Sequence, residues 1–305
     1  MNRTRRMFGW FPFAWAVMAL IAGGFVAGCG DDGDEDASFD PPGNLTYTNG
    51  NNQVTLAWSG SGSEGDEAFA GYDVFRSETT MADLDLEGWA AHKLNADPLT
   101  VRGYVDATAQ NGTKYFYAVR SVKTNGDWSR PTAEVDTAPV VRGGTELIAE
   151  FADNSRPSGF DLSEGDPVAV SSSDPDNRML VDFYLGTAGD NDEPVSGTSG
   201  QLAIKSPNLV LNGNPNWNQR LAQFQVLPSE DASTVDSNVW QNMILLGTTE
   251  QQIESKVIAV RTPPDAEGEV HYGKIVIYDA TINLLGQRSI EIFYTYQVVP
   301  NYVRF

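Results

Sequence analysis

Hydrophobic and polar residues alternate in short runs between residues 39 and 139, and clusters of Gly, Asn, Asp and Pro separate the runs. Val54, Leu56 and Trp58 occupy every second position of one run, so an extended chain turns all three toward one face. This pattern predicts short antiparallel strands packed as a sandwich. Further strands of the same kind are expected at residues 71–76, 104–106 and 113–119.

The segment 39–139 resembles a fibronectin type III domain. The resemblance rests on the opening Pro41-Pro42, on Trp58, on the strand from Tyr72 to Arg76 and on Tyr115. It implies that Trp58 and Tyr72 define the core, and that the Tyr115 hydroxyl closes a tyrosine corner on the upstream backbone. We expect this domain to act as a stalk.

Residues 140–144 are interpreted as a linker, and residues 145–305 as a second domain long enough to bury a core. Residues 272–278 and 289–297 are rich in Ile, Val and Tyr, as paired central strands are. We therefore predict an all-β fold class in both domains, and residues 231–243 are the best position for a short helix. Other strands are expected at residues 145–151, 160–165, 179–185, 201–205, 221–227, 239–246 and 256–262.

The N-terminus has the composition of an export signal. Arg3, Arg5 and Arg6 precede an apolar run without a charge, and Val26-Ala27-Gly28-Cys29 follows it. The last four residues resemble the lipobox of bacterial lipoproteins, whose cysteine carries the acyl chains. We expect residues 1–28 to be a signal peptide, Cys29 to be lipidated, and residues 29–38 to form an acidic tether. Gly30 rather than aspartate follows the cysteine, and the resemblance to bacterial lipoproteins then implies sorting to the outer membrane, facing the periplasm or the exterior.

The chain is acidic, with 41 Asp and Glu against 20 Lys and Arg, and its formal net charge is −21. Such a surface repels nucleic acid, so we expect no nucleic-acid partner. Cys29 is the one cysteine among 305 residues, and its acylation would leave no thiol for a disulfide. Stability must therefore come from buried cores.

Residues 145–305 also resemble the all-β HmuY-type haem-carrier lipoproteins of bacterial surfaces. The matching pieces are residues 160–165, 180–185, 260–262, 272–275 and 293–296. The resemblance implies haem as the cofactor. Best-known members use two histidines, whereas this segment has only His271, so Met179 and Met243 are the remaining candidates for an axial ligand.

A second binding hypothesis concerns Trp217, which lies among amides in the segment 212–218. An exposed indole flanked by amides can stack on a sugar and bind its hydroxyls. The alternative is a turn-rich loop whose indole folds back on the sandwich, and the same alternative applies to Trp89 and Trp128.

No catalytic motif is complete, and we expect no enzyme. Residues 268–274 match the first part of a phosphate-binding loop, but Ile275 stands where Ser or Thr must hold magnesium. Two histidines in different domains do not suit a triad, and no zinc signature occurs, so no metal is expected. The sequence therefore predicts a lipid-anchored surface protein whose C-terminal domain binds haem or another porphyrin, a glycan or a protein partner.

Overall fold

The computed structural model describes residues 39–153, 155–170, 175–189, 200–209, 217–230, 232, 235–236 and 238–305. The predicted signal peptide, Cys29 and the tether lie outside these residues. The described residues, from Phe39 to Phe305, belong to one compact unit. The two groups of strands described below are both part of it.

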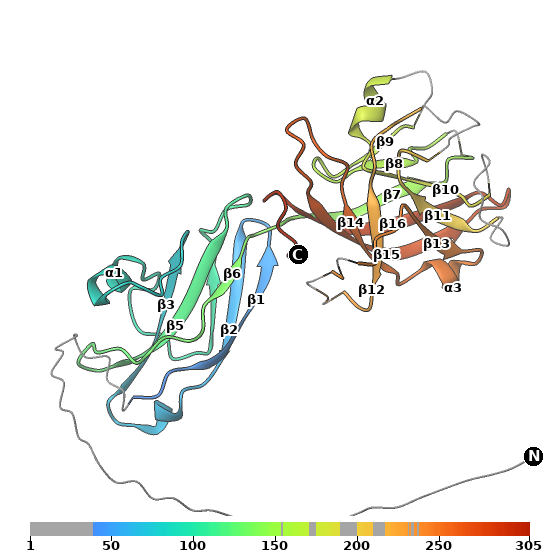
Figure 1. Ribbon diagram of the computed structural model, residues 1–305. Helices are drawn as coiled ribbons and strands as arrows, with labels where there is room; N and C mark the ends of the chain where they lie inside the picture. Colours follow the sequence, from blue (N-terminus) through green and yellow to red (C-terminus); the bar gives the residue numbers. More distant parts are fainter. Residues whose placement is uncertain are drawn as a thin grey trace, which may run out of the picture. The chain divides into compact units, whose positions relative to one another are not determined.

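The first group of strands forms two three-stranded antiparallel sheets (Figure 1). One sheet has the order β1-β2-β4 and the other the order β3-β5-β6. This two-sheet arrangement is what the resemblance to a fibronectin type III domain predicts. The strands are β1 (Gly43–Gly50), β2 (Gln53–Ser59), β3 (Phe69–Ser77), β4 (Gly103–Asp106), β5 (Tyr115–Lys123) and β6 (Val135–Thr137).

The core of this sandwich follows the alternation in β2, where every second residue is buried. Val54, Leu56 and Trp58 pack with Tyr72 from β3 and Val119 from β5. The Trp58 and Tyr72 rings meet edge to face, with centroids 5.6 Å apart. Helix α1 (Leu86–Ala91) follows β3, and a short 3-10 helix, η1 (Gly62–Gly65), precedes it.

The second group of strands forms two five-stranded sheets, with the orders β13-β11-β10-β8-β9 and β12-β14-β15-β16-β7. The expected central strands, β15 and β16, lie inside the second sheet. Two short helices, α2 (Pro175–Leu180) and α3 (Glu250–Ile253), interrupt the strands. The strands are β7 (Val141–Ala149), β8 (Gly159–Asp161), β9 (Asp166–Val168), β10 (Phe183–Thr187), β11 (Leu202–Lys205), β12 (Gln223–Leu227), β13 (Met243–Gly247), β14 (Val257–Arg261), β15 (Tyr272–Ile282) and β16 (Arg288–Gln297).

The two five-stranded sheets enclose one apolar core. Ile275 and Ile277 of β15 and Ile290 and Ile292 of β16 are fully buried and pack with residues of the facing sheet, including Phe183. Because side chains alternate along a strand, the residues between these isoleucines turn to the opposite face of the same sheet. That outer face carries the site described below.

Three local expectations differ from the structure. Residues 141–143, expected in a linker, already form β7 and pair with Tyr296, Thr295 and Tyr294 of β16. Residues 175–180 form helix α2, although residues 179–185 are predicted as a strand. The described residues between 231 and 242 contain no helix. The fold class is nevertheless all-β, with antiparallel pairing throughout the described sheets.

Tyr294 of β16 packs its ring against two glycines that lie far apart in the sequence. A Cβ atom added to Gly143 or to Gly165 would overlap the Tyr294 ring or its hydroxyl. Gly165 also has a φ of 76°, which disfavours any residue with a side chain. The two glycines therefore create the space that the tyrosine fills.

Candidate functional site

Both ring nitrogens of His271, the predicted axial ligand, contact other residues of the protein. Its Nδ1 lies 3.2 Å from the carbonyl oxygen of Gln297, and its Nε2 lies 3.4 Å from Oδ2 of Asp265. The ring also packs against Tyr296, with centroids 5.4 Å apart. Binding of iron through either nitrogen would require one of these interactions to break.

The two methionines proposed as partners of His271 are carried by other elements. Met179 lies in α2 with 64% of its surface exposed, and Met243 begins β13, an edge strand of the other five-stranded sheet. The pocket described below contains neither methionine nor His271 in its lining. The expectation of haem ligation therefore receives no support from the placement of these residues.

Trp217 is buried, with 4% of its surface exposed. Its ring meets Tyr184 edge to face, with centroids 5.4 Å apart, and its Nε1 donates a hydrogen bond to the carbonyl oxygen of Leu209. Residues 210–216 of its loop lie outside the described residues. Of the two alternatives for Trp217, the structure shows the one in which the indole folds back into the protein, so the ring is not exposed for stacking on a sugar.

In the first sandwich, the hydroxyls of Tyr115 and Tyr72 form hydrogen bonds within the protein. The Tyr115 hydroxyl accepts a hydrogen bond of 3.3 Å from the backbone N–H of Gln110, five residues upstream. The Tyr72 hydroxyl accepts from the Ser61 backbone N–H at 2.8 Å and donates to the Glu64 carboxylate. Hydrogen bonds from Arg102 and Tyr72 lower the pKa of Glu64 to about 2.

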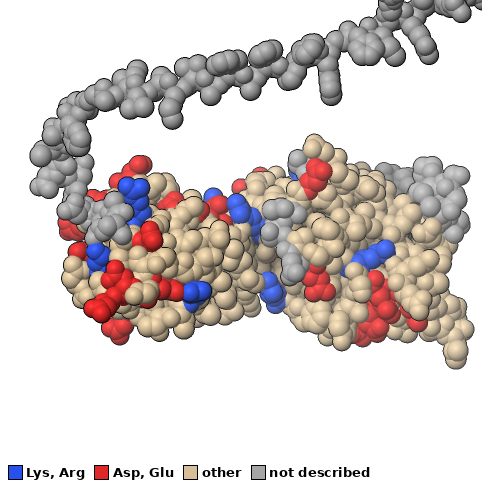
Figure 2. All heavy atoms as spheres, turned by 90° about the horizontal axis from the view of Figure 1, so that it is seen from below, with Lys and Arg blue, Asp and Glu red and all other residues tan. Residues whose placement is uncertain are grey.

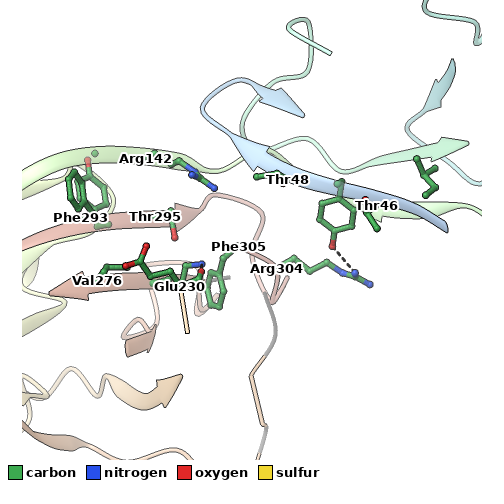
Figure 3. Close-up of a pocket in the computed structure, with 14 residues that line it drawn as sticks. Thr46, Thr48, Arg142, Glu230, Val276, Phe293, Thr295, Arg304 and Phe305 are labelled. Carbon is green, nitrogen blue, oxygen red and sulfur yellow. Dashed lines mark hydrogen bonds between the residues drawn. The ribbon is translucent and has the colours of Figure 1, made fainter. Parts of the chain in front are cut away.

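A groove lies on the outer face of the sheet that contains β15 and β16. It has a volume of about 850 Å³, and Figure 3 shows its lining. The outer face of β7, β15 and β16 contributes its floor. The lining residues are Leu45, Thr46, Tyr47, Thr48, Arg142, Gly143, Glu230, Lys274, Val276, Phe293, Tyr294, Thr295, Arg304 and Phe305.

Three polar side chains form a row across the floor of this groove. Lys274 of β15 pairs in register with Thr295 of β16, and Thr295 pairs with Arg142 of β7. Residues directly opposite each other on neighbouring strands point to the same face. Further along the strands, toward the hairpin, Val276 pairs with Phe293 and supplies the apolar part of the floor.

The C-terminal tail closes one side of the groove. Phe305 is buried against Leu227, Val257 and Ala259. Arg304 donates a hydrogen bond to the Tyr47 hydroxyl at 2.8 Å (Figure 3). It also donates to the Asp136 carboxylate at 3.1 Å. These contacts tie the tail to strand β1, whose residues 45–48 contribute to the lining.

The charges around the groove differ from those of the whole chain. Its lining contains three cations, Arg142, Lys274 and Arg304, and among the described residues a single carboxylate, Glu230, whereas the chain has a net charge of −21. Figure 2 shows, on one face of the molecule, acidic side chains gathered in patches and basic side chains scattered among them. The groove therefore concentrates positive charge on an acidic protein.

Arg142 and Thr295 are the two members of the row whose polar groups have no protein partner among the described residues. Within that part of the chain, no hydrogen bond or ion pair of the Arg142 side chain is found, and partial burial lowers the pKa of its guanidinium. Thr295 is 8% exposed, and its hydroxyl has no hydrogen-bond partner in the same residues. Buried hydroxyls are usually hydrogen-bonded, so this one is open to a ligand or a water molecule.

An aromatic pair extends the groove along the sheet. Phe293 is 40% exposed and Tyr278 is 63% exposed, and their rings meet edge to face with centroids 5.3 Å apart. Exposed aromatic rings on a sheet can stack on the C–H faces of sugars. Hydroxyl, cationic and aromatic groups therefore lie side by side on one surface.

The described residues do not bring metal-ligating side chains together. In these ranges no group of three or more His, Cys, Asp and Glu is positioned to hold a metal ion. Neither His nor Cys occurs among the groove residues named above.

Across the described residues, no helix has the length and apolar character that a membrane crossing requires.

The groove residues were not among the candidates that the sequence suggested. Lys274 and Thr295 stand out in hindsight, because they are polar residues within strands that otherwise consist mainly of Ile, Val and Tyr. Their neighbour Arg142 comes from a segment about 130 residues earlier, which sequence patterns assign to a linker. Only the strand register joins the three.

Comparison with known proteins gives partial matches. No family model matches the chain. An amylopullulanase of Thermoanaerobacterium saccharolyticum is 30% identical over 125 residues, which are 41% of this chain and 9% of that protein. An amylopullulanase of Thermoanaerobacterium thermosulfurigenes is 31% identical over 99 residues, covering 32% of this chain and 5% of that protein. The chain thus spans less than a tenth of the length of either relative.

Two known structures resemble part of the chain. An Fn3-like protein from Clostridium thermocellum is 24% identical, with a TM-score of 0.26, over 33% of this chain and 94% of its own. A fibronectin type III domain derived from human KIAA0970 protein is 16% identical, with a TM-score of 0.25, over 37% of this chain and 86% of its own.

Proposed function

We propose that the protein is a non-enzymatic, lipid-anchored surface protein that binds a saccharide in the groove over β7, β15 and β16. The fibronectin type III-like sandwich serves as the stalk, and the C-terminal sandwich provides the floor of the site. The observation that carries the proposal is the groove itself, where exposed Phe293 adjoins the hydroxyl and cationic side chains of Thr295 and Arg142.

Aromatic and polar groups on one surface suit a sugar, because a pyranose presents both C–H faces and hydroxyls. The two curated relatives are named amylopullulanases, a name for enzymes that act on carbohydrate. The match supports a carbohydrate-associated module. Because the matched part is less than a tenth of either relative, it does not extend their activity to this chain.

The number of carboxylates in the groove favours a binding role over glycoside hydrolysis. Glycoside hydrolysis ordinarily uses two carboxylates that flank the scissile bond. Among the described lining residues, Glu230 is the single carboxylate. We therefore expect a saccharide to be bound and released unchanged, which chromatography of the recovered ligand can test.

The saccharide site is tested with the soluble chain from residue 30 onward on an array of neutral and charged oligosaccharides. We expect selective binding, and about tenfold weaker binding by Phe293→Ala, since an aromatic contact contributes up to about 1.5 kcal/mol. Leu284→Ala is the matched control, because Leu284 is fully exposed and does not line the groove. Absence of binding by the unchanged chain, or an equal loss in both variants, would contradict the proposal.

The anchor is tested separately from the groove. Mass spectrometry of the mature protein should find an acylated N-terminal Cys29, and Cys29→Ala should release the protein from the membrane fraction. Several acyl chains are needed for stable anchoring. An unacylated protein that still begins at Met1 would contradict this part of the proposal.

Haem capture is the alternative raised by sequence resemblance. His271 is engaged by Gln297 and Asp265, and neither methionine lies in the groove. We expect titration of the soluble chain with haemin to produce no specific shift of the Soret band. A stoichiometric shift that is lost in His271→Ala would favour haem over the saccharide proposal.

A further inference from the structure

We propose that the groove selects an anionic saccharide, whose carboxylate binds over Thr295 between Arg142 and Lys274. This inference rests on the proposed function and specifies the ligand. It assigns the carboxylate to the polar row and the sugar ring to Phe293.

The register of the sheet places the three polar side chains at neighbouring positions. Thr295 pairs with Lys274 on one side and with Arg142 on the other. Adjacent strands are about 4.8 Å apart, so the two cationic residues have backbones separated by about 10 Å, with the threonine midway. A single anionic group above Thr295 can therefore be approached from both sides.

Thr295 supplies an unused hydrogen-bond donor at the centre of the row. It is 8% exposed, and no described residue accepts or donates a hydrogen bond at its hydroxyl. A hydroxyl can donate to a carboxylate oxygen. A ligand at this position would satisfy a polar group that the protein itself leaves unpaired.

Arg142 supplies a second open group. It lines the groove, is exposed, and has no ion pair within the described residues. A guanidinium presents a planar set of donors that matches a carboxylate in a two-point interaction. Arg142 is exposed and open toward the groove, so an anion can pair with it, whereas a neutral sugar cannot.

Lys274 contributes positive charge while it also organises the edge of the groove. Its ammonium donates to the carbonyl oxygens of Glu230, at 2.6 Å, and Ala232, at 3.3 Å. These bonds hold the side chain over the outer face of the sheet. Lys274 is thus a positioned charge beside Thr295, and the tests below leave it unchanged because its loss would disturb the fold.

Phe293 makes a saccharide the favoured carrier of the anion. It lies two residues before Thr295 on the same face of β16, at a distance of about 7 Å along the strand, and it is 40% exposed. A ring that stacks on Phe293 can therefore direct a carboxylate toward Thr295. Inorganic anions would use the polar row but gain nothing from the aromatic side chain.

The experiment compares trigalacturonate with its fully methyl-esterified form by calorimetric titration of the soluble chain. The ester keeps the rings and the length but removes the charges. We expect the ester to bind about tenfold or more weakly, as loss of a charge-assisted hydrogen bond requires. Binding of the acid should also weaken as salt concentration rises.

Two variants examine the polar row. Arg142→Gln and Thr295→Val should each weaken trigalacturonate binding about tenfold while leaving binding of the ester unchanged. Thr295→Val should keep or raise the melting temperature, because it replaces an unpaired buried hydroxyl by a methyl group of similar shape. Arg130→Gln is the matched control, since it removes one exposed positive charge outside the groove.

The outcomes separate this inference from the proposed function. Equal affinity for acid and ester, or unaltered binding in both variants, would overturn the anionic selectivity and leave saccharide binding intact. Inorganic phosphate that binds as tightly as trigalacturonate would overturn the assignment to a saccharide. Absence of binding to every oligosaccharide of the array would refute the proposed function as well.

Discussion

Arg288 donates a hydrogen bond from its Nε to Oε2 of Glu150 at 2.7 Å, and both side chains are nearly buried. Arg288 also donates to the carbonyl oxygen of Gly200 and to the Thr187 hydroxyl. The pair thus links β16, the residue after β7, and the end of β10. Because β10 belongs to the other sheet of the C-terminal sandwich, the bond from Arg288 to Thr187 joins the two sheets next to the ion pair.

Removal of one partner should leave a buried charge without compensation. We expect Arg288→Met to lower the free energy of unfolding by about 3–5 kcal/mol, measured by urea denaturation of the soluble chain. The control is Arg102→Met, which breaks the exposed pair with Glu64 and should cost less than about 1 kcal/mol. Similar losses in both variants would contradict the structural role of the buried pair.

Burial of Trp217 predicts a stability defect. Trp217→Ala removes an indole that packs with Tyr184 and donates to Leu209, and truncation of a buried aromatic side chain costs about 3–5 kcal/mol. Differential scanning calorimetry should show a lower melting temperature for the C-terminal sandwich. Leu284→Ala, at an exposed hairpin tip, should leave it unchanged, and an unaltered transition in Trp217→Ala would refute the packed position.

The Tyr115 hydroxyl offers a test of the first sandwich. Tyr115→Phe removes the bond to the Gln110 backbone but keeps the ring, over which the Arg76 guanidinium lies at 4.7 Å from the centroid. We expect a loss of about 0.5–1.5 kcal/mol in unfolding free energy. Tyr278→Phe, at a mostly exposed position, is the control and should be neutral.

Asp182 gives the protein a pH dependence of definite sign. Burial raises the pKa of its carboxyl to about 7, although the backbone N–H of Leu162 and the charge of Arg220 oppose the rise. Between roughly pH 4 and pH 7 the folded state therefore keeps a proton that the unfolded state, with a pKa of about 3.9, has lost. The contribution of this group to stability should fall as pH rises through that window, by an amount on the order of a few kcal/mol.

The measurement is the unfolding free energy of the soluble chain at several pH values. Asp182→Asn has no titrating proton, so its stability should depend less on pH in this range than that of the unchanged chain. Glu64→Gln is a useful contrast. The pKa of Glu64 is lowered from 4.5 to about 2, so its stabilising contribution is lost only at more acid pH. This variant should therefore keep the slope of the unchanged chain over most of the range between pH 4 and pH 7. Identical slopes for the unchanged chain and Asp182→Asn between pH 4 and pH 7 would contradict the assignment.

Alternation of side chains was sufficient to predict much of the fold. Val54, Leu56 and Trp58 lie on one buried face, and the Ile- and Tyr-rich segments became the long paired strands β15 and β16. Short elements are harder to predict from the sequence. The six residues of α2 carry Met179, and six residues are too few for a helical periodicity to appear in the sequence.

The candidate site was less predictable, because it depends on which strands become neighbours. Arg142 reaches Thr295 through pairing across about 150 residues of sequence, and no local pattern reports that register. The position of Trp217 stays open in the sequence for a different reason. Amides around an indole are compatible with an exposed surface or with a turn that covers a core, and only tertiary packing against Tyr184 distinguishes them.

Tyr294 and its two glycines have a consequence for natural sequence variation. Since Gly143 and Gly165 both lie against the same ring, a side chain at either position requires the tyrosine ring to move or to become smaller, and at Gly165 the φ of 76° disfavours a side chain as well. Homologous chains should therefore exchange these three positions together, and a smaller residue at position 294 is expected to accompany any departure from glycine at the other two. Such correlated replacement would reflect that one tyrosine ring occupies the side-chain space of two positions.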